Sequence, residues 1–249
     1  MKILIIKHGS LGDLVLSFGA IKTLNHHYPN DDLYLLTQSN YKNIFIKLPY
    51  VKEILIDNRL SIIQSIINYL KIIKKNKFDL VVDLQNSNRT QIYHFFTRVF
   101  TNTQILSARK FSNIKYQQKT LGVQHITQNH KDQLSKLNIH KYFSPDLSWM
   151  SLKKTNKNNY VIMIPGASKT GSYKKWPTQK FAKIAKHLID KKLDVYLTGS
   201  QLDIEDINEI IKLCPLAQNK INESKIDIFL DLCLGSDLII SNDTGPAHI

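Results

Sequence analysis

Short apolar runs alternate with longer segments of helical periodicity along almost the whole chain, and this alternation limits the fold more than any other feature. Residues 2–6 form an apolar run, and residues 13–28 then carry apolar side chains near helical spacing. Further strands are predicted at residues 33–37, 51–56, 78–84, 160–164, 194–198 and 237–241, and further helices at 61–75, 90–100, 178–191, 204–213 and 225–234. Strands that alternate with helices predict mostly parallel sheets covered by helices, which is the α/β class.

The regular pattern weakens between residues 110 and 159 and then starts again. The polar run 153–159 (KKTNKNN) has the composition of a connector. We therefore predict two doubly wound domains, residues 1–155 and residues 156–249.

The formal net charge of +14, with many more lysines than arginines, is typical of a compositionally biased genome as well as of a surface selected to be basic. A basic surface would attract anionic partners such as nucleotide phosphates, phosphorylated lipids or a membrane face. The lysines are spread along the chain, and no basic block is interleaved with aromatic residues, which disfavours nucleic acid as a partner. No apolar run reaches the length of a membrane-spanning helix. Cys214 and Cys233 are interpreted as free thiols of a cytoplasmic protein, and no Cys/His spacing resembles a metal site.

The first segment that can carry chemistry is residues 8–13 (HGSLGD), between a predicted strand and a predicted helix. The carboxyl end of a strand in an open α/β sheet is where ligands bind. Asp13 is a good helix cap, and it can also serve as a general base that takes a proton from a sugar hydroxyl. The spacing differs from the GxGxxG fingerprint of dinucleotide-binding domains.

Two further loops follow strands of the second half. Residues 165–177 are rich in small residues and lysines, which suits a phosphate cradle or, alternatively, a mobile surface loop. Residues 242–248 (NDTGPAH) join the last strand to a helix start, where free N–H groups can bind a diphosphate or where Asp243 or Thr244 can cap the helix. All three segments are predicted at carboxyl ends of strands and are expected to face a common cleft.

The chain stops soon after the third loop. Residues 247–249 have the pattern of a helix start without any stop signal, and so short a helix cannot sustain itself. We therefore expect the chain to be cut short relative to a complete protein, with an incomplete second domain.

Three stretches together resemble glycosyltransferase family 9, the ADP-heptose:lipopolysaccharide heptosyltransferases and their relatives. They are residues 5–24 (IIKHGSLGDLVLSFGAIKTL), the second loop with its helix (IPGAS…KKWPTQKFAKIAKHL), and residues 240–249 (ISNDTGPAHI). The resemblance implies the GT-B fold, in which two Rossmann-like domains face a cleft. It assigns the acceptor to the N-terminal domain and the nucleotide-sugar donor to the C-terminal one.

The resemblance also implies roles for individual residues. Asp13 falls on the proposed catalytic base, and Lys174 falls on a lysine that contacts the donor phosphates. Gln201 stands where these enzymes often place a glutamate near the ribose, and its amide can still hydrogen-bond a hydroxyl. The remaining donor-binding candidates are Ser168, Thr170, Asp243, Thr244, Gly245 and His248.

The activity implied is the inverting transfer of a heptose or related sugar from an ADP-sugar to a lipopolysaccharide core or another glycolipid. No cofactor and no metal are expected, and the sequence contains no Asp-x-Asp triplet. The expected location is the bacterial cytoplasm, with peripheral contact with the inner membrane. Two other readings stay open: a remnant that binds nucleotide at most, and a Rossmann-type oxidoreductase, which the missing GxGxxG disfavours.

Overall fold

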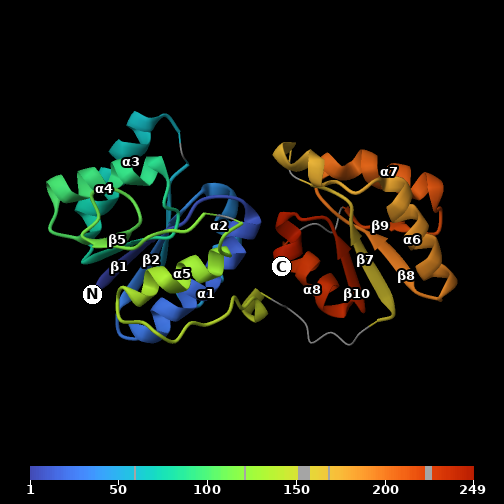
Figure 1. The fold of residues 1–249 in the computed structure, drawn as a ribbon, viewed down its shortest axis with the longest axis horizontal. Coiled ribbons are helices and arrows are strands. Elements are labelled where there is room, and N and C mark those ends of the chain that lie inside the picture. The colour runs from blue at the N-terminus through green and yellow to red at the C-terminus, as the bar shows by residue number, and fades with distance from the viewer. Residues whose placement is uncertain (59, 121, 151–157, 168, 222–225) are drawn as a thin grey trace. The chain divides into compact units, whose positions relative to one another are not determined.

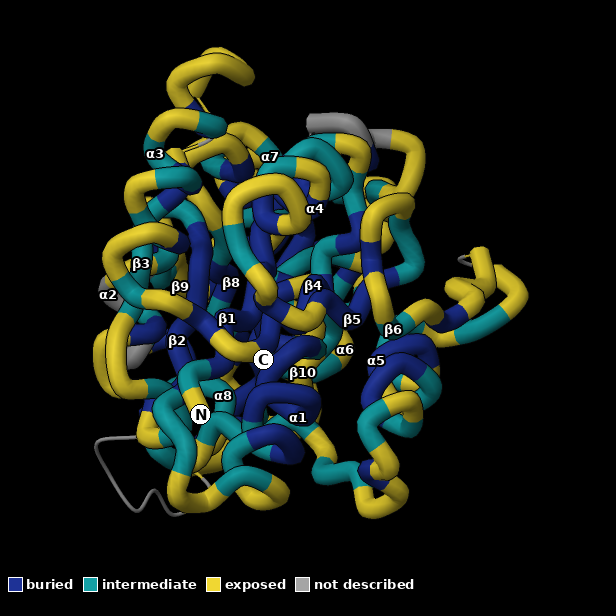
Figure 2. The backbone as a smooth tube through the Cα atoms, turned by 90° about the vertical axis from the view of Figure 1, so that its left-hand side faces the viewer, coloured by how far each residue is buried: buried dark blue, intermediate teal, exposed yellow. Residues whose placement is uncertain are grey.

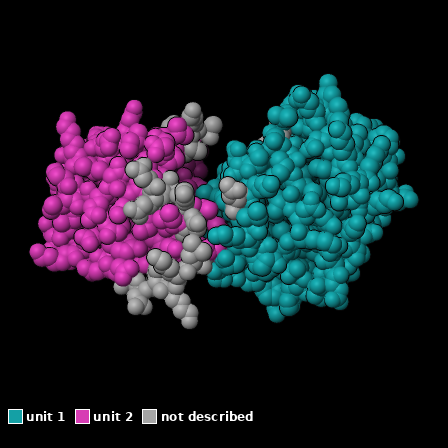
Figure 3. Space-filling view, turned by 180° about the vertical axis from the view of Figure 1, so that it is seen from behind, with its two compact units in different colours: residues 1–149 teal, residues 150–249 magenta. Residues whose placement is uncertain are grey.

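The computed structural model describes residues 1–58, 60–120, 122–150, 158–167, 169–221 and 226–249. These residues form two compact units, Met1–Trp149 and Met150–Ile249, each built on its own parallel sheet (Figures 1 and 3). The predicted α/β class is thus confirmed. Most of the predicted connector at residues 153–159 lies outside the described residues. No helix in the described part is long and apolar enough to cross a membrane.

Unit 1 holds a six-stranded sheet with the order β3-β2-β1-β4-β5-β6, and all of its strand pairs are parallel. Its strands are β1 (Lys2–Ile6), β2 (Asp32–Thr37), β3 (Glu53–Ile56), β4 (Leu80–Asp83), β5 (Gln104–Ser107) and β6 (Ile114–Lys115). Its helices are α1 (Leu11–His27), α2 (Lys42–Phe45), α3 (Ile62–Asn76), α4 (Asn88–Phe100) and α5 (Ile126–Ser135). This strand order is that of a Rossmann-like sheet.

The two faces of this sheet are covered by different helices because the crossovers change direction at β1. Right-handed crossovers put α1 on one face and place α3 and α4 on the other, since the chain moves from β1 to β2 but later from β3 back to β4. Side chains of β1 alternate accordingly, and Leu4 and Ile6 pack with Tyr69 of α3 and Tyr93 of α4. The central strands are fully buried (Figure 2).

Unit 2 holds a four-stranded parallel sheet with the order β10-β7-β8-β9. Its elements are β7 (Tyr160–Ile164), α6 (Thr178–Asp190), β8 (Asp194–Leu197), α7 (Ile204–Leu213), β9 (Gln218–Asn219), α8 (Ile226–Gly235) and β10 (Leu238–Ser241). Helices α6 and α7 cover one face, where Phe181, Ile207 and Ile210 are buried. Phe229 of α8 packs on the other face against Tyr160 and Ile162. The direction of the crossovers therefore changes between β7 and β10.

The predicted elements exist, and their ends differ from the prediction by at most two residues. Helix α1 starts earlier than predicted because Ser10, not Asp13, is its N-cap. Ser61 caps α3 as predicted. The strands β5, β6 and β9 and the helices α2 and α5 were not predicted. They are short or polar, and α5 buries Asn129, His130 and Gln133 rather than an apolar stripe.

The buried imidazole of His130 makes the stability of unit 1 depend on pH. Burial, with a smaller effect from the nearby Lys7 ammonium, lowers the His130 pKa from 6.5 to about 3. The unfolded chain takes up this proton near pH 6.5 and the folded chain only near pH 3, so the free energy of unfolding falls as the pH drops between these values. The slope is at most about 1.4 kcal/mol per pH unit.

When the pH is lowered from 7 to 5, the free energy of unfolding of the parent should fall by about 1–2 kcal/mol more than that of a His130→Leu variant. Urea unfolding followed by circular dichroism at the two pH values measures this difference. His140→Leu, at an exposed position, is the control and should follow the parent. Equal pH dependence of the His130→Leu variant and the parent would show that His130 does not stay neutral in the folded protein.

Candidate active site

The loop between β1 and α1 lies where the crossovers of unit 1 change direction. In open α/β sheets, the loops that leave such a point diverge, and ligands bind at the carboxyl ends of the two strands concerned. Asp13 is the third residue of α1, and its side chain is exposed. The structure therefore places this predicted site residue at the carboxyl edge of the unit 1 sheet.

Asp13 is also part of the N-terminal cap of α1. The backbone N and the Oγ of Ser10 donate to Asp13 Oδ2 over 3.3 and 3.0 Å, and Asp13 N donates to Ser10 Oγ over 3.5 Å. Gly9 has φ +117°, and a Cβ built on it would lie 3.1 Å from Asp13 Oδ2. Within the described part of the chain, the two hydrogen bonds that the Asp13 carboxylate accepts, from Ser10 N and Ser10 Oγ, both end on Oδ2. One oxygen can thus hold the cap while Oδ1 is left to a ligand.

Buried charged groups surround the start of this loop. Burial lowers the pKa of Lys7, while the neighbouring carboxylates of Asp13 and Asp83 act in the opposite sense. The next residue, His8, lies with Nε2 at 3.3 Å from Asp57 Oδ2, which also accepts a 2.5 Å hydrogen bond from Tyr93. These contacts tie the end of β1 to α4 and to the end of β3, so the backbone that carries Asp13 starts from a fixed position.

At the carboxyl edge of unit 2, Asn242 joins its own loop to both ends of the loop 165–177, which is distant in the sequence. Its buried side chain donates through Nδ2 to the carbonyls of Pro165 (2.6 Å) and Gly166 (3.4 Å). Its Oδ1 accepts from the backbone N of Trp176 over 3.1 Å. The second and third predicted loops are therefore held together at the point where the crossovers of unit 2 change direction.

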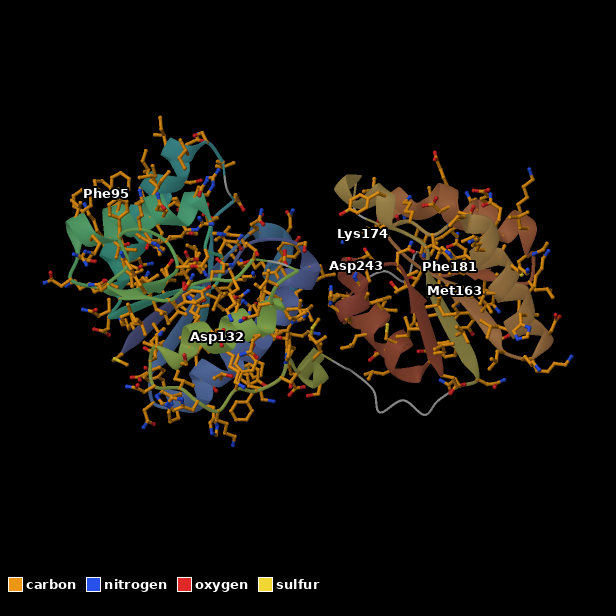
Figure 4. All side chains as sticks on the ribbon, viewed as in Figure 1. Phe95, Asp132, Met163, Lys174, Phe181 and Asp243 are labelled. Carbon is orange, nitrogen blue, oxygen red and sulfur yellow. The ribbon has the colours of Figure 1, made fainter. Side chains whose placement is uncertain are left out.

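Lys174 and Asp243 form an ion pair across these two loops (Figure 4). Their side chains are 37% and 65% exposed. The hydrogen bond from Lys174 lowers the pKa of Asp243, and the same contact raises the pKa of Lys174. Thr244 then precedes a single turn, Gly245–His248, in which His248 is exposed. The pair presents a cation and a carboxylate at the surface of one sheet edge.

The other predicted donor residues are less well defined. Gln201 is exposed and opens the turn Gln201–Asp203, at the carboxyl end of β8. Thr170 lies in the turn Lys169–Lys174, but its side chain is outside the described residues, as is the whole of Ser168. The structure thus brings Lys174 and Asp243 into contact and places Gln201 on the same sheet edge.

Two residues of this edge were not predicted as site residues, namely Asn242 and Asp203. The carboxylate of Asp203 is buried against the backbone, and a Cβ on Gly166 would come within 2.2 Å of it. Ser200 donates to Asp203 Oδ2 from its N and its Oγ, both over 2.8 Å. Residues 9–13 (GSLGD) and 199–203 (GSQLD) share this capping geometry. That repeated Gly-Ser-x-x-Asp pattern is the signal that could have identified Asp203.

We expect Asn242→Ala to destabilise the protein by about 1–3 kcal/mol, because it leaves two buried carbonyls and a partly buried N–H without this partner. It should also weaken nucleotide binding, since the two loops lose their link. Urea unfolding and calorimetric ADP titration measure the two effects. Asn219→Ala, at an exposed residue whose amide oxygen accepts one hydrogen bond from the backbone N of Ile221, is the control. A loss for Asn242→Ala no larger than for this control would contradict the bridging role.

The chain matches a known family model and curated relatives. The family model described as glycosyltransferase family 9 (heptosyltransferase) matches residues 66–249. Lipooligosaccharide heptosyltransferase 2 of Haemophilus influenzae is 21% identical, over 100% of this chain and 80% of that protein.

Two solved structures share the fold. E. coli ADP-heptose lps heptosyltransferase II has a TM-score of 0.73 and 22% identity, and the match covers 98% of this chain and 80% of that one. E. coli heptosyltransferase WaaC with ADP-2-deoxy-2-fluoro heptose has a TM-score of 0.79 and 15% identity, with 100% and 84% covered. The fold is therefore GT-B, with two Rossmann-like domains.

Proposed function

This chain belongs to glycosyltransferase family 9, and from that membership we propose that it transfers a heptose, or a closely related sugar, from an ADP-sugar to a lipopolysaccharide core. The observation that carries the donor assignment is the cluster of Lys174, Asp243 and the turn that follows, held by Asn242 at the carboxyl edge of unit 2. The ligand named in the WaaC structure, an ADP-heptose analogue, supports an ADP-sugar.

In the proposed donor complex, Lys174 leaves Asp243 and donates to the diphosphate. This exchange places the ammonium beside the oxygens on which negative charge builds as the glycosidic bond breaks, which is where a fixed cation lowers the barrier most. The backbone N–H groups of Thr244 and Gly245 supply further donors. Asp243 is then free to accept hydrogen bonds from sugar hydroxyls, with His248 beside it. Gln201, Ser168 and Thr170 complete the proposed donor site.

In the proposed transfer step, a hydroxyl oxygen of the acceptor attacks the anomeric carbon as the bond to the diphosphate breaks. Asp13, through its free Oδ1, takes the hydroxyl proton, and the nucleoside diphosphate leaves with the electron pair. Attack from the face opposite the leaving group inverts the anomeric carbon. A diphosphate leaves without being protonated, so one carboxylate suffices, unlike the pair used in glycoside hydrolysis.

We further propose that the enzyme works on the cytoplasmic side of the inner membrane, in peripheral contact with it, because its acceptor is a glycolipid. The surplus of positive charge supports this location, since anionic lipids attract it.

The test is a transfer assay with the full chain, ADP-heptose and a core glycolipid that lacks heptose. We expect mass spectrometry to show one added heptose, and NMR of the product to show the anomeric configuration opposite to that of the donor. Parallel reactions with UDP- and GDP-linked sugars identify the base. Transfer from a UDP-sugar alone would overturn the donor assignment, and retention of configuration would overturn the single-step mechanism.

A further inference from the structure

The outer side of α4 exposes large apolar side chains that the proposed reaction does not use. Phe95, Val99 and Phe100 are among the exposed apolar residues of the protein, and so is Phe111, which follows β5. The rings form a connected row: Phe95 lies 5.3 Å from Phe111 and 5.4 Å from Phe96, and Phe96 stacks on Phe100 at 6.2 Å. Phe95 lies on the outer side of the helix (Figure 4). We call these five side chains the aromatic face.

The neighbouring helix α3 adds positive charge to this face. Helices α3 and α4 pack side by side (Figure 1), and Lys74 of α3 lies 4.8 Å from the centre of the Phe100 ring. Lys71 and Lys75 lie on the same helix and are exposed, and α4 contributes Arg98. Neither helix contains an aspartate or a glutamate. On these two helices, the acidic or basic side chains beside the aromatic face are therefore all basic.

A surface pocket of about 460 Å³ opens at one end of the aromatic face. Phe100 and Lys74 form part of its wall, and Lys77, Asn102 and Thr101 add an ammonium, an amide and a hydroxyl. Asp79 is the acidic residue of the wall, and its Oδ2 accepts from the backbone N of Lys2. The Thr101 hydroxyl donates to the carbonyl of Thr97, so the two ammonium groups and the amide are the groups that can bind a phosphate monoanion or diester.

We propose that the aromatic face and its basic border are the surface by which this enzyme docks on an anionic phospholipid bilayer. Aromatic and aliphatic side chains enter the headgroup region, and lysines beside them gain from the negative surface potential. A folded partner protein would need complementary acidic groups, whereas a bilayer supplies both the apolar layer and the phosphates. The pocket beside Lys74 and Lys77 takes a lipid headgroup phosphate.

The docking surface lies toward the C-terminal ends of α3 and α4. Because every strand pair of the sheet is parallel, the N-termini of these helices lie at the carboxyl edge that carries Asp13, whereas Lys74, Phe100 and the pocket lie at the opposite, amino edge. The proposed docking surface is therefore separate from the proposed catalytic edge, and bilayer binding does not rest on the proposed function.

The test is sedimentation of the full chain with vesicles of phosphatidylglycerol and phosphatidylethanolamine, compared with phosphatidylcholine vesicles. We expect binding to the anionic vesicles only, and weaker binding at high salt. Phe95→Ser/Val99→Ser and Lys71→Glu/Lys74→Glu should each lower the partition coefficient by about tenfold or more. The matched controls lie in unit 2. They are Leu213→Ser/Leu216→Ser and Lys183→Glu/Lys186→Glu, at exposed sites, and should stay within about twofold of the parent.

A conservative variant keeps the test independent of folding defects. Phe95→Trp should show a blue-shifted tryptophan emission with anionic vesicles and quenching by brominated lipids, relative to the parent protein. Equal binding of the face variants and the controls, or no quenching of Phe95→Trp, would overturn the proposal. The proposal would also be overturned if the parent formed dimers at higher concentration and the face variants, but not the controls, abolished them. The aromatic face would then join two copies of this chain.

The two proposals can fail separately. Nucleotide-sugar transfer to a water-soluble acceptor fragment does not need a bilayer and should be unaffected by the face variants. Vesicle binding without substrates does not need transfer and should be unaffected by Asp13→Ala.

Discussion

Replacing Asp13 by alanine is expected to lower kcat by about 10²–10⁴-fold, which is the usual cost of losing a general base. The physical reason is that the acceptor hydroxyl must shed a proton as its oxygen attacks, and no other exposed carboxylate lies on the loop after β1. Steady-state transfer from ADP-heptose, with the donor saturating, measures the change. Donor affinity should stay nearly constant, because the proposed donor site lies on unit 2.

The capping role of Asp13 requires a control, because its loss can also destabilise α1. Ser10→Ala removes the hydroxyl contact to Asp13 Oδ2 and the cap on Asp13 N, yet it keeps the carboxylate. Both variants should lose about 1 kcal/mol of unfolding free energy. Only Asp13→Ala should lose turnover. If Ser10→Ala lost as much activity as Asp13→Ala, or if Asp13→Ala kept turnover within about twofold, Asp13 could not be the base.

Replacing Lys174 by glutamine is expected to weaken ADP-sugar binding by about 10–100-fold, the range for losing one charge-assisted hydrogen bond. Turnover should fall as well, because the leaving diphosphate gains negative charge in the transition state. Calorimetric titration with ADP measures the binding effect, and single-turnover kinetics measure the effect on transfer. The stability should hardly change, since the Lys174–Asp243 pair is largely exposed.

Lys175 offers the matched control for this experiment. It is the next residue, carries the same charge and pairs with Asp206 of α7 instead of Asp243. Lys175→Gln therefore removes the same charge from the same loop without touching the proposed diphosphate site. We expect its ADP affinity to stay within about threefold of the parent. Equal losses in both variants would mean that the loop contributes only its overall positive charge.

Much of the fold was predictable because its signal is local. Buried strands such as β1 and β7 are continuous apolar runs, and amphipathic helices such as α7 show their period within one segment. The ends of α3 and α1 depend on which serine caps them, and the pattern identified Ser61 but not Ser10. Helix α5 had no such signal, because its buried residues are mostly polar. Gln133, for example, donates to the carbonyls of Asp83 and Leu106 on other elements.

The candidate site was predictable as a set of loops but not as a set of contacts. Asp13, Lys174 and Asp243 were identified because loops at the carboxyl ends of strands, with these residue types, resemble those of a known family. The roles of Asn242 and Asp203 could not be recognised in this way. Asn242 acts on backbone more than seventy residues away in the sequence, at Pro165 and Gly166, and no local pattern encodes such a partner. Asp203 packs against the distant Gly166, and of its contacts only those with Ser200 follow the local Gly-Ser-x-x-Asp pattern.

The sequence by itself determined the α/β class, the positions of most strands and helices, and the three loops that can carry chemistry. These depend on apolar periodicity and on glycine and capping residues, which act over a few neighbouring positions. The tertiary structure alone decided which loops meet at one sheet edge, that Lys174 pairs with Asp243, and that α3 and α4 share an aromatic, basic surface. Such contacts depend on strand order and crossover direction, which bring together residues that no sequence window contains.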